Sequence, residues 1–140
     1  NLELVAVGGD ENDPLYHEAV RRTRHVYPRV DHSIMPYLYS AADLTCYYWR
    51  PPALWYGGGG SVSVFESLAC DTPLVSNTLI HFPNRDEVRR IGFTPNSEND
   101  FASSIKNAIE HVDQFRCREV SMKYFSWDQI IAATIKDYDS

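Results

Sequence analysis

Short apolar runs bounded by turn residues alternate along the chain with segments whose apolar residues recur at helical spacing. The apolar runs predict short strands. We expect these strands at residues 2–7 (LELVAV), 29–32, 44–49 (LTCYYW) and 73–76 (PLVS). Two glycines follow the first run directly, so this strand, which we expect to be buried, should end in a turn.

Polar residues that suit helix starts precede the helical segments. Asp13 is the expected N-cap of a helix that has Pro14 at its first position. Ser33 is the expected cap of a brief helix after it. A further short helix is predicted over residues 84–90, stopped by Gly92.

The last third of the chain is predicted to be helical throughout. Ser97 and Asp100 have the spacing of a capping box, and so do Ser126 and Gln129, so each pair predicts a helix start. The first helix has an apolar face of Phe101, Ile105, Ala108, Ile109 and Val112, and the closing helix has one of Trp127, Ile130, Ile131, Thr134 and Tyr138.

Strands that alternate with helices favour a parallel sheet covered on both faces. We therefore predict an α/β fold with one doubly wound, Rossmann-like parallel sheet, helices on both faces and an all-helical C-terminal third. With 140 residues, the chain is expected to form a single domain over 1–140. Ligands bind beyond the carboxyl ends of the strands in such a sheet. The loops after Val7, Trp49 and Ser76 are therefore the expected places for site residues.

Composition and charge narrow the classes of function. Hydrophobic residues make up 44% of the chain, which fits a packed globular protein. The formal charge of -6 argues against nucleic acid as a partner, because duplex-binding domains gather Lys and Arg on one face. No apolar run approaches the roughly 18 residues of a membrane span, and nothing near Asn1 resembles a signal peptide. Because the sequence begins with Asn1 rather than Met, we expect a piece of a longer chain.

The cysteines and histidines predict neither a disulfide framework nor a metal site. Cys46, Cys70 and Cys117 are widely spaced and form no C-x-x-C pair, so we expect reduced packing cysteines and a cytoplasmic protein. The histidines include no pair at i, i+4, so no metal ion is expected as a cofactor.

The most informative stretch is a run of four glycines at residues 57–60, followed by SVSVFESLAC. Glycines let backbone N–H groups approach a bound anion closely, and a helix that starts near Ser61 would add its free amides and its dipole. Such a loop suits a phosphate or diphosphate. The alternation S-V-S-V suits equally well a hairpin turn that leads into a strand. Local sequence favours neither alternative.

Glu66 is the candidate polar residue within this segment. On an ideal helix it lies between Val62, Ala69 and Cys70, on the apolar side. A carboxylate is costly to bury there unless it accepts hydrogen bonds, which ligand hydroxyls would supply. The alternative is that Glu66 lies at the edge of the apolar stripe with its carboxylate in solvent, and spacing alone favours this alternative.

Several segments together resemble a known family. The run GGGGSVSVFESLACDTPLVS is similar to the "E-G-F-G-x-x-x-x-E-A-M-A-C-G-T-P-V-V" segment of retaining glycosyltransferases of family 4, which have the two-domain GT-B architecture. LELVAVGG resembles their "L-x-I-V-G-x-G", YLYSAADL their "L-Y-x-x-A-D-V", and FSWDQI the "F-S-W" of their closing helix. These segments occur in the family's order over nearly the whole chain.

The resemblance implies a domain that binds a nucleotide-sugar donor, linked to UDP or GDP. Glu66 matches the family's ribose-binding glutamate. The diphosphate-binding positions are Gly58, Gly59, Gly60, Ser61 and Val62. His32 and Ser33 are implied to lie near the base, although for Ser33 we favour a role as a helix cap.

Two departures from the family limit what the chain can do alone. Gly58 stands where the family has a glutamate that touches the donor sugar, so sugar contacts must come from backbone amides, from Arg50 or Trp55, or from outside the chain. The unit that supplies the family's basic pair and the N-terminal acceptor-binding domain have no counterpart here. The resemblance therefore implies the C-terminal donor-binding part of a larger enzyme of saccharide synthesis, inactive alone and without a catalytic residue in this chain.

Other classes of protein stay open. One is a degenerate, non-catalytic nucleotide-binding domain, and another is a flavodoxin-like interaction domain. Peripheral association of the full enzyme with a membrane also stays open. Three of the four aromatic residues Tyr47, Tyr48, Trp49 and Trp55 are expected to serve strand packing rather than substrate.

Overall fold

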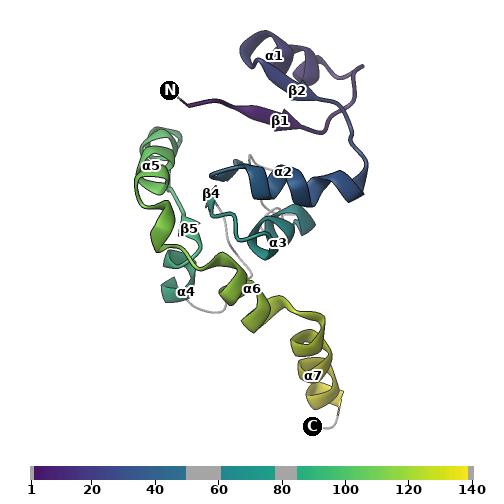
Figure 1. Cartoon of the computed structure of the whole chain (residues 1–140), viewed down its shortest axis with the longest axis vertical. Helices are drawn as coiled ribbons and strands as arrows, with labels where there is room; N and C mark the ends of the chain where they lie inside the picture. Colours follow the sequence, from purple (N-terminus) through teal and green to yellow (C-terminus); the bar gives the residue numbers. More distant parts are fainter. Residues whose placement is uncertain (1, 50–60, 78–84, 139–140) are drawn as a thin grey trace. The chain divides into compact units, whose positions relative to one another are not determined.

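The computed structural model describes residues 2–49, 61–77 and 85–138 (Figure 1). The chain divides into two compact units, Asn1–Met35 and Pro36–Ser140, and each is described by itself. Both units are of α/β type with parallel strands, as the sequence predicts. The described strands form two small sheets rather than one doubly wound sheet.

The first unit contains a parallel pair of strands joined by a helix. Strand β1 (Val5–Val7) pairs with β2 (His25–Tyr27), and α1 (Pro14–Arg22) connects them. The Asp13 carboxylate accepts a hydrogen bond from the backbone N–H of Leu15 at 2.8 Å, and Pro14 takes the first position of the helix. The predicted start of this helix is therefore confirmed.

Three details of this unit differ from the sequence predictions. The second strand lies at His25–Tyr27, and the predicted strand at 29–32 is wrong. A 3-10 turn, η1 (His32–Ile34), follows instead, and Asp31 rather than Ser33 caps it, because the Asp31 carboxylate accepts from the Ser33 backbone N–H at 2.8 Å. Strand β1 is not buried as expected, since Val5 remains 49% exposed.

The second unit is built on a three-stranded parallel sheet in the order β3-β4-β5. Its strands are β3 (Thr45–Tyr47), β4 (Leu74–Ser76) and β5 (Gly92–Phe93). Helix α2 (Met35–Ala41) precedes the sheet, α3 (Val62–Ala69) lies between β3 and β4 in the chain, and α4 (Arg85–Arg89) lies between β4 and β5. Strands at 44–49 and 73–76 and a short helix near 84–90 are thus confirmed.

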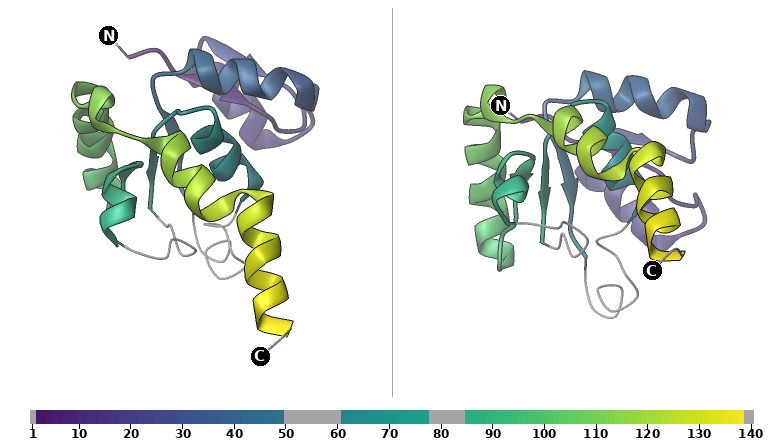
Figure 2. Two further views of the ribbon diagram at one scale, coloured as in Figure 1. Left: turned by 60° about the horizontal axis from the view of Figure 1, so that its bottom comes forward. Right: turned by 90° about the horizontal axis from the view of Figure 1, so that it is seen from below.

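Helices cover both faces of this sheet, as Figure 2 shows. Helix α5 (Glu98–Glu110) packs on one side against β4 and β5. On the other side lie α3, which contacts β4, and α6 (Cys117–Phe125), which packs against α3. The core between the helices and the sheet consists of fully buried side chains: Val64, Leu68, Leu74, Ile91, Cys117 and Val120.

Gly92 lets two strands approach closely. Its φ of +152° is one that residues with side chains rarely adopt, and an added Cβ would lie 1.7 Å from the Leu74 carbonyl oxygen. The sequence predicts that Gly92 stops the preceding helix. In the structure that helix ends at Arg89, and Gly92 begins β5.

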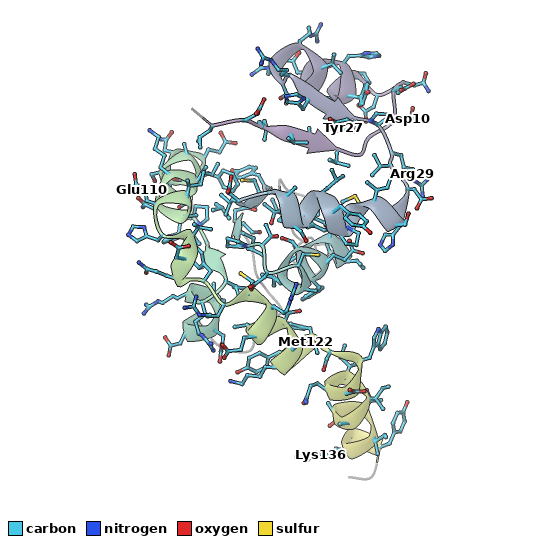
Figure 3. All side chains as sticks on the ribbon, in the orientation of Figure 1. Asp10, Tyr27, Arg29, Glu110, Met122 and Lys136 are labelled. Carbon is cyan, nitrogen blue, oxygen red and sulfur yellow. The ribbon has the colours of Figure 1, made fainter. Side chains whose placement is uncertain are left out.

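The C-terminal part is helical, in agreement with the sequence prediction. Ser97 caps α5, and its hydroxyl accepts from the Asp100 backbone N–H at 3.2 Å. The 3-10 turn η4 (Val112–Gln114) and α6 follow, and then α7 (Trp127–Tyr138) packs against α6. Figure 3 labels Met122 on α6 and Lys136 on α7.

The apolar face of α7 is not buried in the part of the chain that the structure describes. Its large apolar side chains are exposed: Trp127, Ile130, Ile131, Ile135 and Tyr138. No helix among the described residues is both long and apolar enough to cross a bilayer.

A network of charged groups fastens α4 to α6. The Glu87 carboxylate, whose side chain is only 9% exposed, accepts from Lys123 Nζ at 2.9 Å and from the Tyr124 hydroxyl at 3.0 Å. Arg90 also donates to Glu87, at 3.0 Å, and to Glu119 at 2.5 Å. Glu87, on α4, is therefore a buried carboxylate with two partners on α6 and a third, Arg90, just after the end of α4, and a buried charge is tolerated when it is paired in this way.

Candidate functional site

The predicted site lies at the carboxyl edge of the β3–β5 sheet. Strands β3 and β4 are parallel, and the segment that connects them contains α3, so α3 begins near the edge where β3 ends. The Tyr47 hydroxyl, on the last residue of β3, donates to the carbonyl oxygen of Ser63 in the first turn of α3 at 2.8 Å. The end of the strand and the start of the helix are thus held together.

The segment after the glycine run is a helix and not a strand. Ser61 is the N-cap residue, and VSVFESLA follows it as α3. The Ser61 side chain makes no capping hydrogen bond to the helix, and its hydroxyl instead lies 2.7 Å from the hydroxyl of Ser63. The alternative of a strand that follows a hairpin turn is therefore excluded for residues 62–69.

Glu66 lies one turn inside this helix and is half-buried. The Tyr39 hydroxyl, from α2, donates to Glu66 Oε2 at 3.3 Å. The carboxylate therefore faces another protein element at a hydrogen-bonding distance. The sequence left two alternatives for Glu66, a buried position on the apolar side of the helix and an exposed position at its edge. The observed position lies between them, because the residue is half-buried.

The surroundings of Glu66 differ from those on the ideal helix. Val62 is 68% exposed, and Ala69 is exposed too. The buried face of α3 is formed by Val64, Leu68 and a serine, Ser67, that is 0% exposed. A hydrophobic pattern does not reveal a buried serine. The buried face predicted for α3 is therefore rotated about the helix axis from the observed one.

Two hydrogen bonds make the burial of Ser67 possible. Its hydroxyl lies 2.6 Å from Thr45 Oγ1 of β3 and 3.1 Å from the Thr72 carbonyl oxygen, to which it donates. A buried hydroxyl with such partners avoids the cost of desolvation without compensation. These contacts fix the rotation of α3 about its axis and therefore the position of Glu66.

Tyr39 is a site residue that sequence reasoning missed. It is 6% exposed, and its backbone carbonyl accepts from the Thr72 hydroxyl at 2.7 Å. Burial raises the pKa of the Tyr39 hydroxyl, and the neighbouring Tyr47 and Glu66 raise it further. The hydroxyl therefore keeps its proton at physiological pH and can donate a hydrogen bond to Glu66. The available signal was a tyrosine at an apolar position of the YLYSAA helix.

A second missed feature joins the ends of β3 and β4. The Asn77 carboxamide accepts from the Trp49 backbone N–H at 2.9 Å and donates to the Trp49 carbonyl oxygen at 2.8 Å. The signal for it is a single amide residue placed directly after the buried strand LVS. This pair of hydrogen bonds holds together two chain segments at the edge where the site is expected.

His32 and Ser33, the expected base contacts, belong to the first unit, in the turn η1. An open hollow of about 610 Å³ in the same unit lies at the carboxyl ends of β1 and β2. It is lined by Gly9, Asp10, Glu11, Asn12, Pro28 and Arg29, of which Figure 3 labels Asp10 and Arg29. Neither His32 nor Ser33 lines this hollow.

The structure brings together part of the predicted site. Ser61, Val62 and Glu66 lie on or next to the first two turns of one helix. Gly58, Gly59 and Gly60 lie outside the described residues, as do Arg50 and Trp55. Within the ranges that are described, no three His, Cys, Asp or Glu side chains gather in a way that could hold a metal ion.

Comparisons with known proteins add no further evidence. No model of a known protein family matches the chain, and no match is found among curated proteins or among solved structures.

Proposed function

We propose that this chain binds a nucleoside diphosphate sugar, with UDP or GDP as the nucleotide, as the donor-binding part of a retaining glycosyltransferase. One observation carries the proposal. A helix begins beside the carboxyl edge of a parallel sheet, directly after the glycine run, and holds a half-buried glutamate one turn from its start. Crevices at this edge are the usual ligand sites of open α/β sheets.

The start of α3 supplies the chemistry for a diphosphate. The first N–H groups of a helix lack partners within the helix, and the helix dipole favours negative charge there. Ser61 does not use its side chain to cap these groups. In this proposal the amides of Ser61 and Val62, together with those of Gly58, Gly59 and Gly60, bind the diphosphate oxygens.

Glu66 supplies the acceptor for the ribose. A carboxylate accepts hydrogen bonds only, and a ribose diol offers two donors. The Tyr39 hydroxyl occupies one oxygen of the carboxylate at 3.3 Å and so restricts its orientation. We propose that the ribose hydroxyls bind to this carboxylate.

The reaction follows from the charge that develops during sugar transfer. When the bond between the sugar and the diphosphate breaks, negative charge grows on the leaving group. Preorganised amides and a helix dipole stabilise that charge, and in principle this requires no metal ion. The acceptor-binding groups come from an N-terminal domain, so this chain alone is expected to bind a donor and transfer nothing. We propose that the enzyme acts in the cytoplasm, where its three cysteines would stay reduced.

The proposal also includes a single sheet for the whole chain. The resemblance implies one doubly wound sheet, in which the strands of both units belong to a single parallel sheet. Two observations support a doubly wound sheet: the strands pair in parallel within each unit, and helices cover both faces of the β3–β5 sheet.

Titration of the ¹⁵N-labelled chain with UDP and with GDP, followed by NMR, tests the proposed function. The backbone amides of residues 61–66 are expected to shift and to saturate with one of the two nucleotides. UMP, which lacks the second phosphate, serves as the control and is expected to cause smaller shifts. If these amides do not move with either diphosphate at millimolar concentration, the donor site is refuted and the flavodoxin-like alternative gains.

A further inference from the structure

Helix α6 begins without a cap from its own N-cap residue. Arg116 holds that position, and its side chain makes no capping hydrogen bond to the helix. The Arg116 guanidinium donates instead to the carbonyl oxygens of Asp113 and Phe115, at 2.7 Å and 2.6 Å. Because the first N–H groups of a helix have no partner within the helix, the start of α6 needs an acceptor from another element.

Asp71, just after the end of α3, supplies that acceptor. Its carboxylate accepts from the backbone N–H of Arg118, in the first turn of α6, at 2.8 Å and across 47 residues of sequence. In return, Arg118 Nε donates to the carbonyl oxygen of Ala69, the last residue of α3, at 2.9 Å. The two side chains thus cap each other's segments. Their charges also suit the helix dipoles, since the carboxylate lies at a helix start and the guanidinium at a helix end.

Asp71 has a backbone conformation that usually selects glycine. Its φ of +65° lies in the left-handed region. The turn after α3 is closed by a hydrogen bond from the Asp71 N–H to the Leu68 carbonyl oxygen, at 3.0 Å. A second one, also at 3.0 Å, runs from the Thr72 N–H to the Ser67 carbonyl oxygen. Glycine is the usual left-handed residue of such a helix end, but glycine has no side chain that could accept from Arg118.

Buried groups lie directly beneath this pair of caps. Cys117, the first residue of α6, and Val120, one turn on, are both 0% exposed. The Cys117 thiol donates to the Ile91 carbonyl oxygen at 3.6 Å. Burial, with a smaller contribution from the Asp71 carboxylate, raises the pKa of the Cys117 thiol to about 12. A thiol that is both buried and protonated reacts only when its segment opens, so Cys117 can report such opening.

We propose that Asp71 and Arg118 form a clasp that holds the start of α6 folded and closed on the end of α3. The clasp is a conformational device within the second unit and does not depend on the proposed function. Both residues are exposed, so water competes for their hydrogen bonds. The start of α6 therefore opens more readily than the core beneath it, and the clasp sets how often it opens.

Hydrogen exchange followed by NMR tests the clasp at the amides of Arg118 and Val120. Asp71→Gly removes the acceptor but suits the left-handed φ, so this variant is expected to fold. We expect the two amides to exchange about 5- to 10-fold faster, in line with the loss of a helix cap, and the amides of β4 to change much less. Asp71→Asn is the matched control. Asparagine keeps an acceptor oxygen and tolerates this φ, so exchange is expected within about twofold of the parent chain.

Thiol labelling gives a second measurement. With Cys46→Ser and Cys70→Ser, Cys117 is the one remaining thiol of the chain. Its reaction with an aromatic disulfide reagent is expected to be about 5- to 10-fold faster in Asp71→Gly. Asp71→Asn measures how much of this change comes from the lost charge alone.

Arg118→Ala tests whether the two caps depend on each other. Alanine favours a helix as much as arginine does, so this variant removes only the side-chain contact with Ala69. We expect faster labelling of Cys117, and a double variant with Asp71→Gly that is no faster than the faster single variant. If the two factors multiply instead, the caps act independently and there is no clasp. If the amides of α6 and the thiol stay as slow in Asp71→Gly as in the parent chain, the clasp is refuted.

Discussion

Glu66 is the residue whose charge matters most to the proposed site. Glu66→Gln keeps the size of the side chain and removes the negative charge that the ribose hydroxyls would bind. Hydrogen bonds to a charged group contribute about 1.5–3 kcal/mol, so affinity for UDP or GDP is expected to fall by roughly 10- to 100-fold. Isothermal titration calorimetry measures this loss directly.

The matched control is Glu110→Gln, which removes an exposed carboxylate at the end of α5 and is expected to leave affinity unchanged. A Glu66→Gln variant that binds as tightly as the parent chain would remove Glu66 from the site.

Gly92 is the residue at which an added methyl group should harm folding most. Gly92→Ala combines a strained φ of +152° with a Cβ only 1.7 Å from the Leu74 carbonyl oxygen, so β4 and β5 must separate. Backbone strain and overpacking together should cost at least about 3 kcal/mol of unfolding free energy, measured by urea denaturation.

Gly8→Ala separates the two causes. Gly8 has a φ of +100°, but nothing lies within 4 Å of an added Cβ, so backbone strain acts there without overpacking. Its expected cost is about 1 kcal/mol. Equal losses in the two variants would contradict the close approach of the strands at Gly92.

At the scale of elements, the charged network between α4 and α6 makes stability depend on pH. The hydrogen bond from Lys123 lowers the pKa of Glu87 below its ordinary value of 4.5, with further contributions from Tyr124 and Arg90. Because the folded state has the lower pKa, the stabilisation by Glu87 is complete above pH 4.5 and is lost as the pH falls below that value.

Glu87→Gln is therefore expected to lower the unfolding free energy by about 1–2 kcal/mol at pH 7. It should also reduce the further loss of stability as the pH falls below 4.5. Urea denaturation across this pH range measures both effects. Glu119→Gln is the control, since Glu119 is 61% exposed and bonds only the outer side of the network, so its loss should be much smaller. An unchanged pH profile in Glu87→Gln would assign the acid sensitivity to other carboxylates.

Helix starts were predictable from sequence where one side chain decides them. The Asp13 cap and the Ser97 cap act within three residues, so local spacing is enough to identify them. Local spacing failed at Ser33, because the neighbouring Asp31 offers a stronger acceptor and captures the Ser33 N–H and hydroxyl. Two candidate caps so close together compete, and charge decides between them.

The orientation of α3 was not predictable from the hydrophobic pattern. Its rotation depends on Ser67, whose buried hydroxyl finds partners on Thr45 and Thr72, which are 22 and 5 residues away in sequence. Tyr39 was missed for the same reason, since its contact with Glu66 spans 27 residues. The position of Glu66 in sequence could be inferred, but the partner that orients it could not.

If the whole chain forms the proposed doubly wound sheet, the backbone amide of Val7 should be protected from hydrogen exchange. Alternate N–H groups of a parallel strand point to opposite sides, and Gly8 at the end of β1 donates to the Tyr27 carbonyl oxygen at 3.1 Å. The Val7 amide therefore points away from β2. A single sheet requires another strand on that side, so we expect slow hydrogen exchange at Val7.

Hydrogen exchange followed by NMR measures this protection. The amides of β4, which lies between β3 and β5, are the internal reference for a central strand. Exchange at Val7 within about tenfold of theirs is the expected result. Exchange at the rate of an unprotected amide, together with protection at Gly8, would mean that β1 pairs on one side only, and the doubly wound sheet would be refuted.

Deamidation of Asn77 would change the hydrogen bonds at the edge of the sheet. Only a group with both an N–H donor and a carbonyl acceptor can engage both backbone groups of Trp49, and deamidation converts it to a carboxylate that only accepts. After deamidation, a negatively charged carboxylate would face the Trp49 carbonyl oxygen and repel it. Prolonged storage at alkaline pH would then loosen the edge where the ligand is proposed to bind, while the core beneath it stays packed.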